Sequence, residues 1–210
     1  IIFFLLMLGI SYVAAYFFNK DLLAIIFIYS IIQILYCFIL KQIPILDIFC
    51  ISSGFFLRAI SGALVTNNYL SPWFLICIGL ISMFLAIEKR KSELNNALST
   101  GKFNKKVLKK YSLPLLVKFE NTLISSSFIT YSLWAAGPNL GGAKSPWMLI
   151  TVPLVLLGLF RYQLIGELNN LDKNKLSTEF PEQIFLKDRG MQTIILTWFL
   201  ITVIIGFSFK

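Results

Sequence analysis

Long apolar runs bounded by charged or turn-forming residues are the feature that most constrains this chain. A helix that crosses a bilayer needs about 20 mostly apolar residues. Seven runs come close to or reach that length: residues 1–18, 22–40, 45–65, 72–87, 115–136, 147–165 and 191–209. Because only helices and closed barrels can span a membrane, we expect an all-α, polytopic transmembrane helix bundle that forms a single domain over residues 1–210.

The composition agrees with a membrane protein and excludes several chemistries. Of the 210 residues, 57% are hydrophobic and 14% are charged, whereas soluble domains are roughly 45–50% apolar and about 25% charged. The sequence has no histidine, which excludes imidazole bases, histidine-ligated haem and most zinc sites. Cys37, Cys50 and Cys77 lie in apolar runs without metal-ligand spacing, and we expect them to be small buried hydrophobic residues.

The basic residues predict an orientation. If the second, fourth and sixth connections between runs face the cytoplasm, that side holds 14 of the 19 Lys and Arg residues, and nine of the ten acidic residues lie at or near it. Topology and attraction to anionic headgroups explain most of the net charge of +9. No nucleic-acid-binding motif accompanies the charge, so nucleic acid is not expected as a partner.

Arg58 is the residue that topology explains least. It lies thirteen residues into the third run, where a charge is costly and usually marks a polar cavity. Asp47 and Gly54 share its helical stripe, and small residues surround it. The alternative is a packing face on which a neighbouring helix satisfies Arg58.

Other polar residues join Arg58 at the predicted cytoplasmic end. If the helix of the fourth run continues past the membrane surface, Lys89 and Glu93 are an i,i+4 pair beside Arg90. Each could be a solvated surface charge, but together they suit a magnesium-bound diphosphate, since carboxylates hold the cation and Lys or Arg holds phosphate oxygens. The converging residues are Tyr36, Lys41, Asp47, Arg58, Lys89, Arg90, Glu93, Arg161 and Arg189.

The order of these motifs resembles the decaprenyl-phosphate phosphoribosyltransferase branch of the UbiA prenyltransferase superfamily, over nearly the whole chain. The stretches that carry the resemblance are Tyr36-x4-Lys41-x5-Asp47, GFFLRAISGA at 54–63, SPWF at 71–74, EKRKSEL at 88–94, Arg161-Tyr162, Pro181-Glu182 and Asp188-Arg189. The resemblance implies nine helices around a cavity open to the cytoplasm, with a first metal motif, NDxxDxxxD, after the second helix. That motif is absent from these residues, and the chain begins Ile-Ile-Phe-Phe without a methionine. We therefore expect an N-terminally truncated chain with about seven of nine spans, which lacks the first two helices and the first Asp-rich motif and is inactive alone.

The resemblance implies an enzyme that moves 5-phosphoribose from phosphoribosyl pyrophosphate to polyprenyl (decaprenyl) phosphate and releases pyrophosphate, with Mg2+ as cofactor. Such an enzyme would serve cell-wall lipid precursor biosynthesis in the bacterial inner membrane, with its active site facing the cytoplasm. The sequence leaves the oligomeric state open, with a homo-oligomer among the partners considered.

Roles follow from the resemblance and from charge. Asp47, Arg58, Lys89 and Glu93 are predicted as catalytic, with Asp47 and Glu93 as magnesium ligands beside the main ligands of the missing motif. The predicted substrate-binding residues are Tyr36, Lys41, Arg90, Arg161, Glu182 and Arg189.

Two other readings compete with this one. A UbiA-type aromatic prenyltransferase, which uses a polyprenyl diphosphate, is less favoured because Lys89-Arg90-x-x-Glu93 stands where such enzymes carry a second aspartate-rich motif. The other competing interpretation is an anion transporter or a structural membrane subunit. The chain shows no inverted repeat, which argues against the transporter, and a structural subunit leaves Arg58 unexplained.

Overall fold

The structure is a computed structural model that describes residues 2–66, 68–103, 105–171, 178 and 180–208. The ends of the first and last predicted spans, residues 1 and 209, and two lysines of the orientation count, Lys173 and Lys175, lie outside the described residues. Helices alone make up the regular structure of the described part, as expected. The chain forms two compact units, residues 1–70 and 71–210.

The first unit contains three long helices. They are α1 (Ile2–Phe18), α2 (Lys20–Phe38) and α3 (Leu46–Thr66), and a single 3₁₀ turn, η1 (Leu40–Gln42), stands between α2 and α3. Asn19 caps α2, since its side chain accepts a hydrogen bond of 2.8 Å from the Asp21 N–H. The Tyr12 hydroxyl donates to Ser30 Oγ at 3.0 Å, which joins α1 to α2 in this apolar unit.

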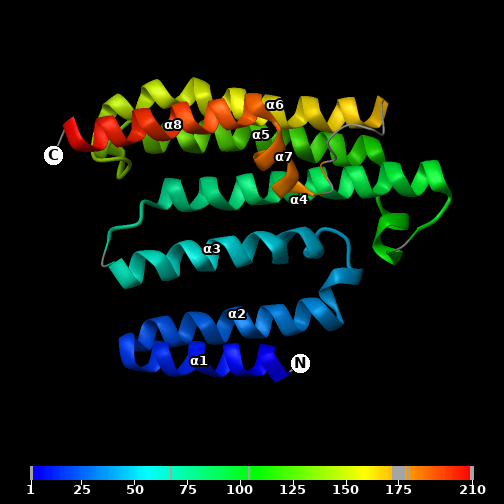
Figure 1. Cartoon of the computed structure of the whole chain (residues 1–210), viewed down its shortest axis with the longest axis horizontal. Helices are drawn as coiled ribbons and strands as arrows, with labels where there is room; N and C mark the ends of the chain where they lie inside the picture. The colour runs from blue at the N-terminus through cyan, green and yellow to red at the C-terminus, as the bar shows by residue number, and fades with distance from the viewer. Residues whose placement is uncertain (1, 67, 104, 172–177, 179, 209–210) are drawn as a thin grey trace. The chain divides into compact units, whose positions relative to one another are not determined.

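The second unit is a helical bundle with short 3₁₀ connections (Figure 1). Helix α4 packs most extensively on α5, and α6 packs on α8. The helices of the second unit are α4 (Pro72–Thr100), η2 (Lys106–Lys110), α5 (Leu113–Ala135), η3 (Pro138–Leu140), η4 (Pro146–Thr151), α6 (Val152–Leu171), α7 (Pro181–Lys187) and α8 (Arg189–Ser208). Proline at the first or second position begins α4, α5 and α7, where its missing N–H costs nothing.

Two clusters of buried side chains hold the second unit together. One cluster contains a chain of hydrogen bonds, in which Trp198 Nε1 donates to the Tyr131 hydroxyl at 2.7 Å and Tyr131 lies 2.7 Å from Thr151 Oγ1. Since Thr151 already donates to the Met148 carbonyl, Tyr131 is the donor to Thr151. The other cluster surrounds Phe84 and Tyr162, whose rings meet edge to face.

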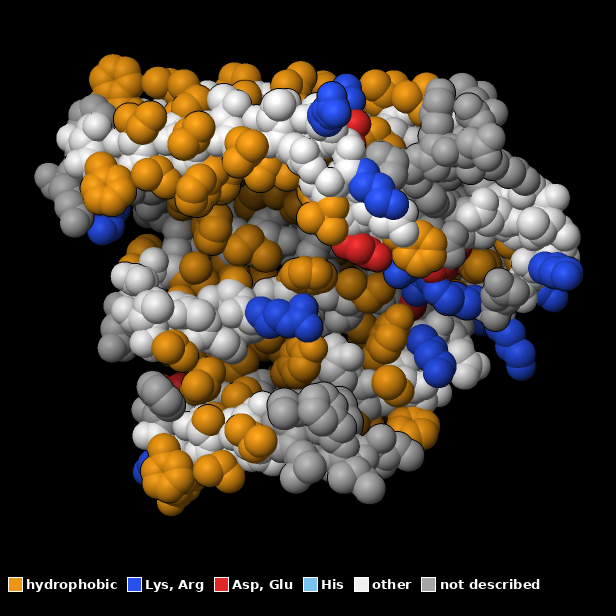
Figure 2. Space-filling model, in the orientation of Figure 1, with side chains coloured by type: hydrophobic (Ala, Val, Ile, Leu, Met, Phe, Trp, Pro, Cys, Tyr) orange, Lys and Arg blue, Asp and Glu red, His pale blue; other side chains and the backbone are white. Residues whose placement is uncertain are grey.

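The surface of the second unit is apolar over its helices (Figure 2). Many large hydrophobic side chains on α6 and α8 are exposed, including Phe160, Leu164, Phe199 and Ile204. Exposed apolar area of this extent on long helices is typical of a surface that faces lipid. Lys and Arg side chains gather instead toward the end where α4 meets η2.

Five helices are long and apolar enough to cross a membrane: Lys20–Phe38, Leu46–Thr66, Pro72–Thr100, Pro146–Leu168 and Arg189–Ser208. The sequence predicts seven spans, and a helix stands at each of the seven positions. Helix α1, with 17 residues, and α5, which carries Lys118, Glu120 and three successive serines, do not meet the same criterion. Those two spans remain predictions.

The main departure from the predicted elements is the length of α4. The apolar run ends at Ile87, but the helix continues through thirteen further residues to Thr100. The local sequence explains this, because residues 88–98 are mostly helix-forming Glu, Lys, Arg, Leu and Ala, and Gly101 ends the helix in the left-handed conformation with φ 69°. A polar helical segment therefore extends beyond the apolar part of α4.

Candidate functional site

The ten residues predicted for the site divide between the two units. Those of the first unit are Tyr36, Lys41, Asp47 and Arg58; those of the second are Lys89, Arg90, Glu93, Arg161, Glu182 and Arg189. Their convergence on one cavity remains a prediction, and the geometry that follows is that within each unit.

Arg58 finds its partner on the neighbouring helix. Its Nη2 donates to the Tyr29 hydroxyl of α2 at 2.8 Å, and its guanidinium carbon lies 5.4 Å from the ring centres of both Tyr29 and Phe55. Hydrogen bonding and cation–π attraction thus stabilise a charge within an apolar helix. This is the neighbouring-helix alternative raised from the sequence. Among the described residues, no hydrogen bond engages the other guanidinium nitrogens, so a ligand could contact them.

Asp47 lies in the first turn of α3 and is fully buried. The chain enters α3 through Ile45, which has φ 71°, a conformation unusual for a β-branched residue. Lys41 is exposed in η1 and Tyr36 is half-buried near the end of α2. The unusual backbone at Ile45 fixes the direction in which α3 starts, and with it the place of Asp47 relative to Lys41.

The polar end of α4 places a carboxylate between two cations. Glu93 is 8% exposed, and its Oε2 lies 2.5 Å from Arg90 Nη1 while its Oε1 lies 2.6 Å from Lys105 Nζ. The sequence predicts Lys89 as the i,i+4 partner of Glu93. The structure instead gives this role to Arg90, because the i,i+3 position also lies on the same helical face and the Arg90 side chain is buried there. Lys89 makes no ion pair with any other described residue.

A second charged cluster, centred on Lys91, is the most buried in the unit. Lys91 Nζ lies 2.7 Å from Glu88 Oε1, 2.7 Å from Glu120 Oε2 of α5 and 3.0 Å from Glu167 Oε1 of α6. Glu88 and Glu120 are fully buried, while Glu167 is exposed. Buried charges of this kind are tolerated only when they are paired, so Lys91 ties three helices together at the polar end of α4.

Glycine allows this cluster to approach α6. A Cβ built at Gly166 would collide with Glu88 Oε2, so a larger residue there would push the carboxylate away from its place. Thr178 Oγ1, from the connection after α6, donates to the Glu88 carbonyl at 3.4 Å. The connection is thereby fixed to α4 at one described point.

Arg161 is held by Asp188 in a two-pronged ion pair. Its Nε and Nη2 donate to Asp188 Oδ1 and Oδ2 at 3.0 and 2.9 Å. Asp188 also caps α8, because its Oδ1 accepts from the Met191 N–H at 2.6 Å. The hydrogen bonds from Arg161, with a smaller contribution from the Met191 N–H, lower the pKa of the Asp188 carboxyl. Arg189 and Glu182, in α8 and α7 nearby in sequence, are exposed.

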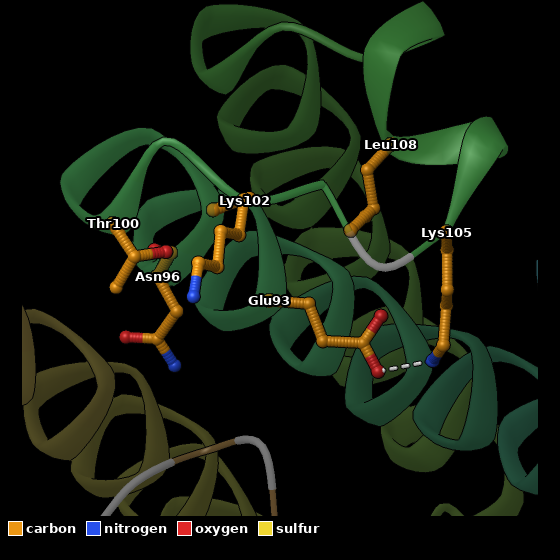
Figure 3. A pocket seen from close by; sticks show the side chains of 7 residues that line it. Glu93, Asn96, Thr100, Lys102, Lys105 and Leu108 are labelled. Atoms are coloured by element: carbon orange, nitrogen blue, oxygen red, sulfur yellow. Dashed lines mark hydrogen bonds and ion pairs between the residues drawn. The ribbon is translucent and has the colours of Figure 1, made fainter.

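A pocket of about 250 Å³ opens beside Glu93 (Figure 3). Its walls come from one face of α4 and from the connection that folds back over that face. The lining residues are Glu93, Asn96, Ala97, Thr100, Lys102, Lys105 and Leu108. The lysines give this pocket a net positive charge, which suits an anion.

A fit to magnesium is not apparent from these residues alone. No group of three or more His, Cys, Asp or Glu in the described part of the chain lies close enough together to hold a metal ion. The Glu93 carboxylate is engaged by Arg90 and Lys105, and Asp47 lies in the other unit. Asp47 and Glu93 as magnesium ligands therefore stay predictions.

Neither the Lys91 cluster nor the pocket lysines were predicted from the sequence. Glu120 could have been found by the argument that singled out Arg58, since it lies six residues into a predicted apolar span. Lys102 and Lys105 gave no such signal, because they lie among the five lysines of residues 101–112 and only the fold separates them from the others. The three cysteines were expected to be buried, but Cys37 is exposed and Cys50 half-buried, and only Cys77 is buried. The surfaces of α2 and α3 that carry them are apolar, as lipid-facing surfaces are.

Comparison with known sequences decides the family. The sequence profile of the UbiA prenyltransferase family matches residues 1–186 of the 210. The chain belongs to the UbiA prenyltransferase family. With its apolar helices, membership of this family makes it an integral membrane protein.

Several curated relatives share one name, decaprenyl-phosphate phosphoribosyltransferase. The relative from Mycolicibacterium smegmatis is 32% identical over 196 residues, which cover 90% of this chain and 59% of the relative. That from Mycobacterium tuberculosis is 31% identical over 193 residues, 91% of this chain and 61% of the relative. That from Corynebacterium glutamicum is 29% identical over 195 residues, 92% of this chain and 56% of the relative. This UbiA-family chain thus spans about 60% of the length of the relatives it matches.

Proposed function

We propose that this UbiA-family protein transfers the 5-phosphoribosyl group of phosphoribosyl pyrophosphate to a polyprenyl phosphate, with release of pyrophosphate. The observation that carries the proposal is the match, over about nine tenths of the chain, to relatives named decaprenyl-phosphate phosphoribosyltransferase. The site is proposed to face the cytoplasm from the bacterial inner membrane, where the positively charged connections are predicted to lie.

The chemistry needs no protein nucleophile. The bond between ribose C1 and the diphosphate oxygen breaks, and pyrophosphate leaves with the electron pair. An oxygen of the polyprenyl phosphate, which is already anionic near neutral pH, forms the new bond to C1. Catalysis then consists of positioning the two substrates and stabilising the negative charge that grows on the leaving pyrophosphate.

The residues of the second unit supply cations suited to that task. Arg90 and Lys105 both pair with Glu93, which fixes the two cationic side chains beside the pocket, and the Lys105 side chain is about half exposed there. We assign Arg90 to the donor diphosphate and keep Lys89, Arg161 and Arg189 as further candidates at the mouth of the site. Tyr36, Lys41, Asp47 and Arg58 of the first unit remain proposed on the resemblance, with Glu182 of the second.

The divalent cation of this proposal is Mg2+. The described residues do not make a metal site by themselves, so no step is assigned to the metal here. The Asp-rich motif NDxxDxxxD is not found among these 210 residues. The proposed role of magnesium is tested by adding it back to chelator-treated membranes.

The proposal is tested in membranes that express the complete gene. The assay measures transfer of label from ribose-labelled phosphoribosyl pyrophosphate to decaprenyl phosphate. Wild-type protein should form labelled lipid in the presence of Mg2+. Arg90→Gln should lower kcat/KM by roughly tenfold to a hundredfold, the loss of one charge-assisted hydrogen bond. Lys110→Gln, an equal charge change at an exposed lysine of η2, is the matched control and should behave as wild type.

A parallel reaction with a polyprenyl diphosphate and an aromatic acceptor separates the competing functions. Prenylation of the aromatic acceptor without labelled lipid would assign the protein to the aromatic prenyltransferases. If well-folded protein forms neither product, that result would favour the interpretation as a transporter or as a structural subunit.

A further inference from the structure

The pocket at the end of α4 is built by a reversal of the chain. Glu93, Asn96, Ala97 and Thr100 recur at helical spacing and therefore form one face of α4. Gly101, with φ 69°, turns the chain back, and η2 then anchors it through Val107 and Leu108, which are 1% and 3% exposed. The connection carrying Lys102 and Lys105 is thus fixed over the last turns of α4.

The pocket contains one lysine, Lys102, whose ammonium group has no partner among the described residues. Figure 3 shows its side chain extending beside that of Asn96. Lys105 points to Glu93, to which it donates at 2.6 Å, and two of its three N–H bonds remain. The Thr100 hydroxyl donates to the Asn96 carbonyl at 2.7 Å, so it accepts from a ligand or from water rather than donating.

The wider charge around the pocket is one-sided. Residues 101–112 contain five lysines and no acid, and Glu93 is the one acid among the residues that line the pocket. That acid is already neutralised by Arg90 and Lys105. A ligand that enters therefore meets ammonium groups, which bind phosphate as point charges, and no uncompensated carboxylate.

Size and position favour a single phosphate group over a diphosphate with its lipid chain. At roughly 30 Å³ per water molecule, a volume of about 250 Å³ is that of about eight waters, enough for a phosphate group and part of a sugar. The lining residues of α4 begin six residues beyond Ile87, the last residue of the apolar run. At 1.5 Å per residue, the pocket starts about 9 Å beyond the apolar part of the helix, away from lipid.

From these observations we infer that this pocket binds the phosphate monoester at the 5-position of the donor ribose, with Lys102, Lys105 and Asn96 as its ligands. The inference rests on the proposed function and adds a subsite to it. Arg90 lies on the other side of Glu93 from Lys105 in the ion-pair chain, so one acid would position both a cation for the diphosphate and a cation for the 5-phosphate.

The test is kinetic and compares two lysines that differ in whether they line the pocket. Lys102→Gln should raise KM for phosphoribosyl pyrophosphate about tenfold, the loss of about 1.4 kcal/mol of binding, and leave KM for decaprenyl phosphate unchanged. Lys110→Gln removes the same charge from η2 outside the pocket and should leave both KM values unchanged. A donor analogue with a hydroxyl in place of the 5-phosphate should be used poorly by wild type and equally poorly by Lys102→Gln.

A second experiment measures binding and does not depend on transfer of the phosphoribosyl group. Purified protein should bind ribose 5-phosphate but not ribose in calorimetry, and Lys102→Gln should weaken that binding about tenfold while Lys110→Gln does not. Binding of ribose 5-phosphate without transfer would remove the proposed function and keep the phosphate pocket. The inference would be overturned if Lys102→Gln changed neither the KM for the donor nor the binding of ribose 5-phosphate. A selective rise in KM for the lipid would also overturn it, because that result would assign the pocket to the acceptor phosphate.

A variant that fills the pocket provides an independent check. Ala97 forms part of its wall and is 4% exposed. Ala97→Leu should abolish ribose 5-phosphate binding, while Leu98→Ala at the exposed neighbouring position should not. Retained binding in a well-folded Ala97→Leu protein would place the phosphate elsewhere.

Discussion

Lys91 is surrounded by three carboxylates, two of which are fully buried. Removal of its charge would leave Glu88 and Glu120 buried beside each other without a cation. Breaking a buried ion pair from one side typically costs about 3–5 kcal/mol. The Lys91 ammonium therefore stabilises the contact of α4 with α5 and α6, on which the position of Arg90 and Glu93 depends.

We predict that Lys91→Met lowers the free energy of unfolding by roughly 3 kcal/mol for this reason, measured as a lower midpoint of thermal unfolding in detergent. Lys118→Met, the same change at an exposed lysine of α5, is the control and should change the midpoint little. Equal midpoints for Lys91→Met and wild type would show that the cluster contributes nothing to stability.

Asp188 gives the structure a defined response to acid. Its pKa is lowered mainly by the hydrogen bonds from Arg161, so the folded state favours the carboxylate. A group whose pKa is lowered on folding contributes stability that is present above its unfolded pKa, about 3.9, and is lost as pH falls through the folded value. Asparagine at this position can still cap α8 but cannot form the ion pair.

Asp188→Asn should therefore be less stable than wild type by about 1 kcal/mol or less at pH 7, since Arg161 is partly exposed to solvent. The difference should shrink below pH 4 as the wild-type carboxylate is protonated. Thermal unfolding of both proteins between pH 3 and pH 7 checks this, and a difference that stays constant over that range would contradict the assigned ion pair.

Helix α5 is the element whose relation to the membrane is least determined by its composition. It is long enough to span, but it carries Lys118, Glu120 and a polar stripe, and it does not meet the criterion that five other helices meet. Glu120 is buried against Lys91, so part of this polarity belongs to the protein interior and not to a lipid-facing surface. Burial of its charge inside the bundle is what would allow α5 to cross.

Cysteine labelling on either side of α5 tests whether it crosses. In a Cys37→Ser background, Lys110→Cys should react with an impermeant maleimide only in inside-out vesicles, and Lys144→Cys only in right-side-out vesicles. Both lysines are exposed and lie on opposite ends of α5. If both cysteines react from the same side of the membrane, α5 does not span it. If each cysteine reacts only from the side expected for the other, the orientation is the reverse of the one predicted.

Sequence patterns predicted the elements better than the contacts between them. The apolar runs placed all seven long helices within a few residues at most ends, because hydrophobic length is a local property. They did not predict that α4 continues to Thr100, since an apolar count stops at Ile87, nor the short α7 within a polar connection. The need of Arg58 for a partner was predictable, but its identity, Tyr29, depends on how α2 and α3 pack.

In the candidate site, too, some residues could be predicted from the sequence while the contacts between them could not. Lys89, Arg90 and Glu93 are recognisable from charge and spacing, but pairs such as Lys91 with Glu120 join residues 29 positions apart, and only the fold defines them. The pocket residues Lys102 and Lys105 are two of several neighbouring lysines, and the left-handed turn at Gly101 decides which of them face α4.

At the scale of the whole molecule, the chain combines two properties. The helices present apolar surfaces over most of their length. At the polar end of the second unit, Arg90 and Lys105 pair with Glu93, and Lys102 lines the same pocket. In the proposed function, a soluble phosphorylated donor binds at that end, and a lipid phosphate reaches it from the membrane. The chain belongs to the UbiA prenyltransferase family, and it is similar to relatives named decaprenyl-phosphate phosphoribosyltransferase.

The most direct measurement is a cryo-electron microscopy structure of the complete protein with phosphoribosyl pyrophosphate bound. We expect the donor's phosphates at the polar end of α4, with the diphosphate in contact with Arg90 and the 5-phosphate within hydrogen-bond distance of Lys102. A donor bound away from α4, with Arg90 and Lys102 in contact only with protein and solvent, would contradict this expectation.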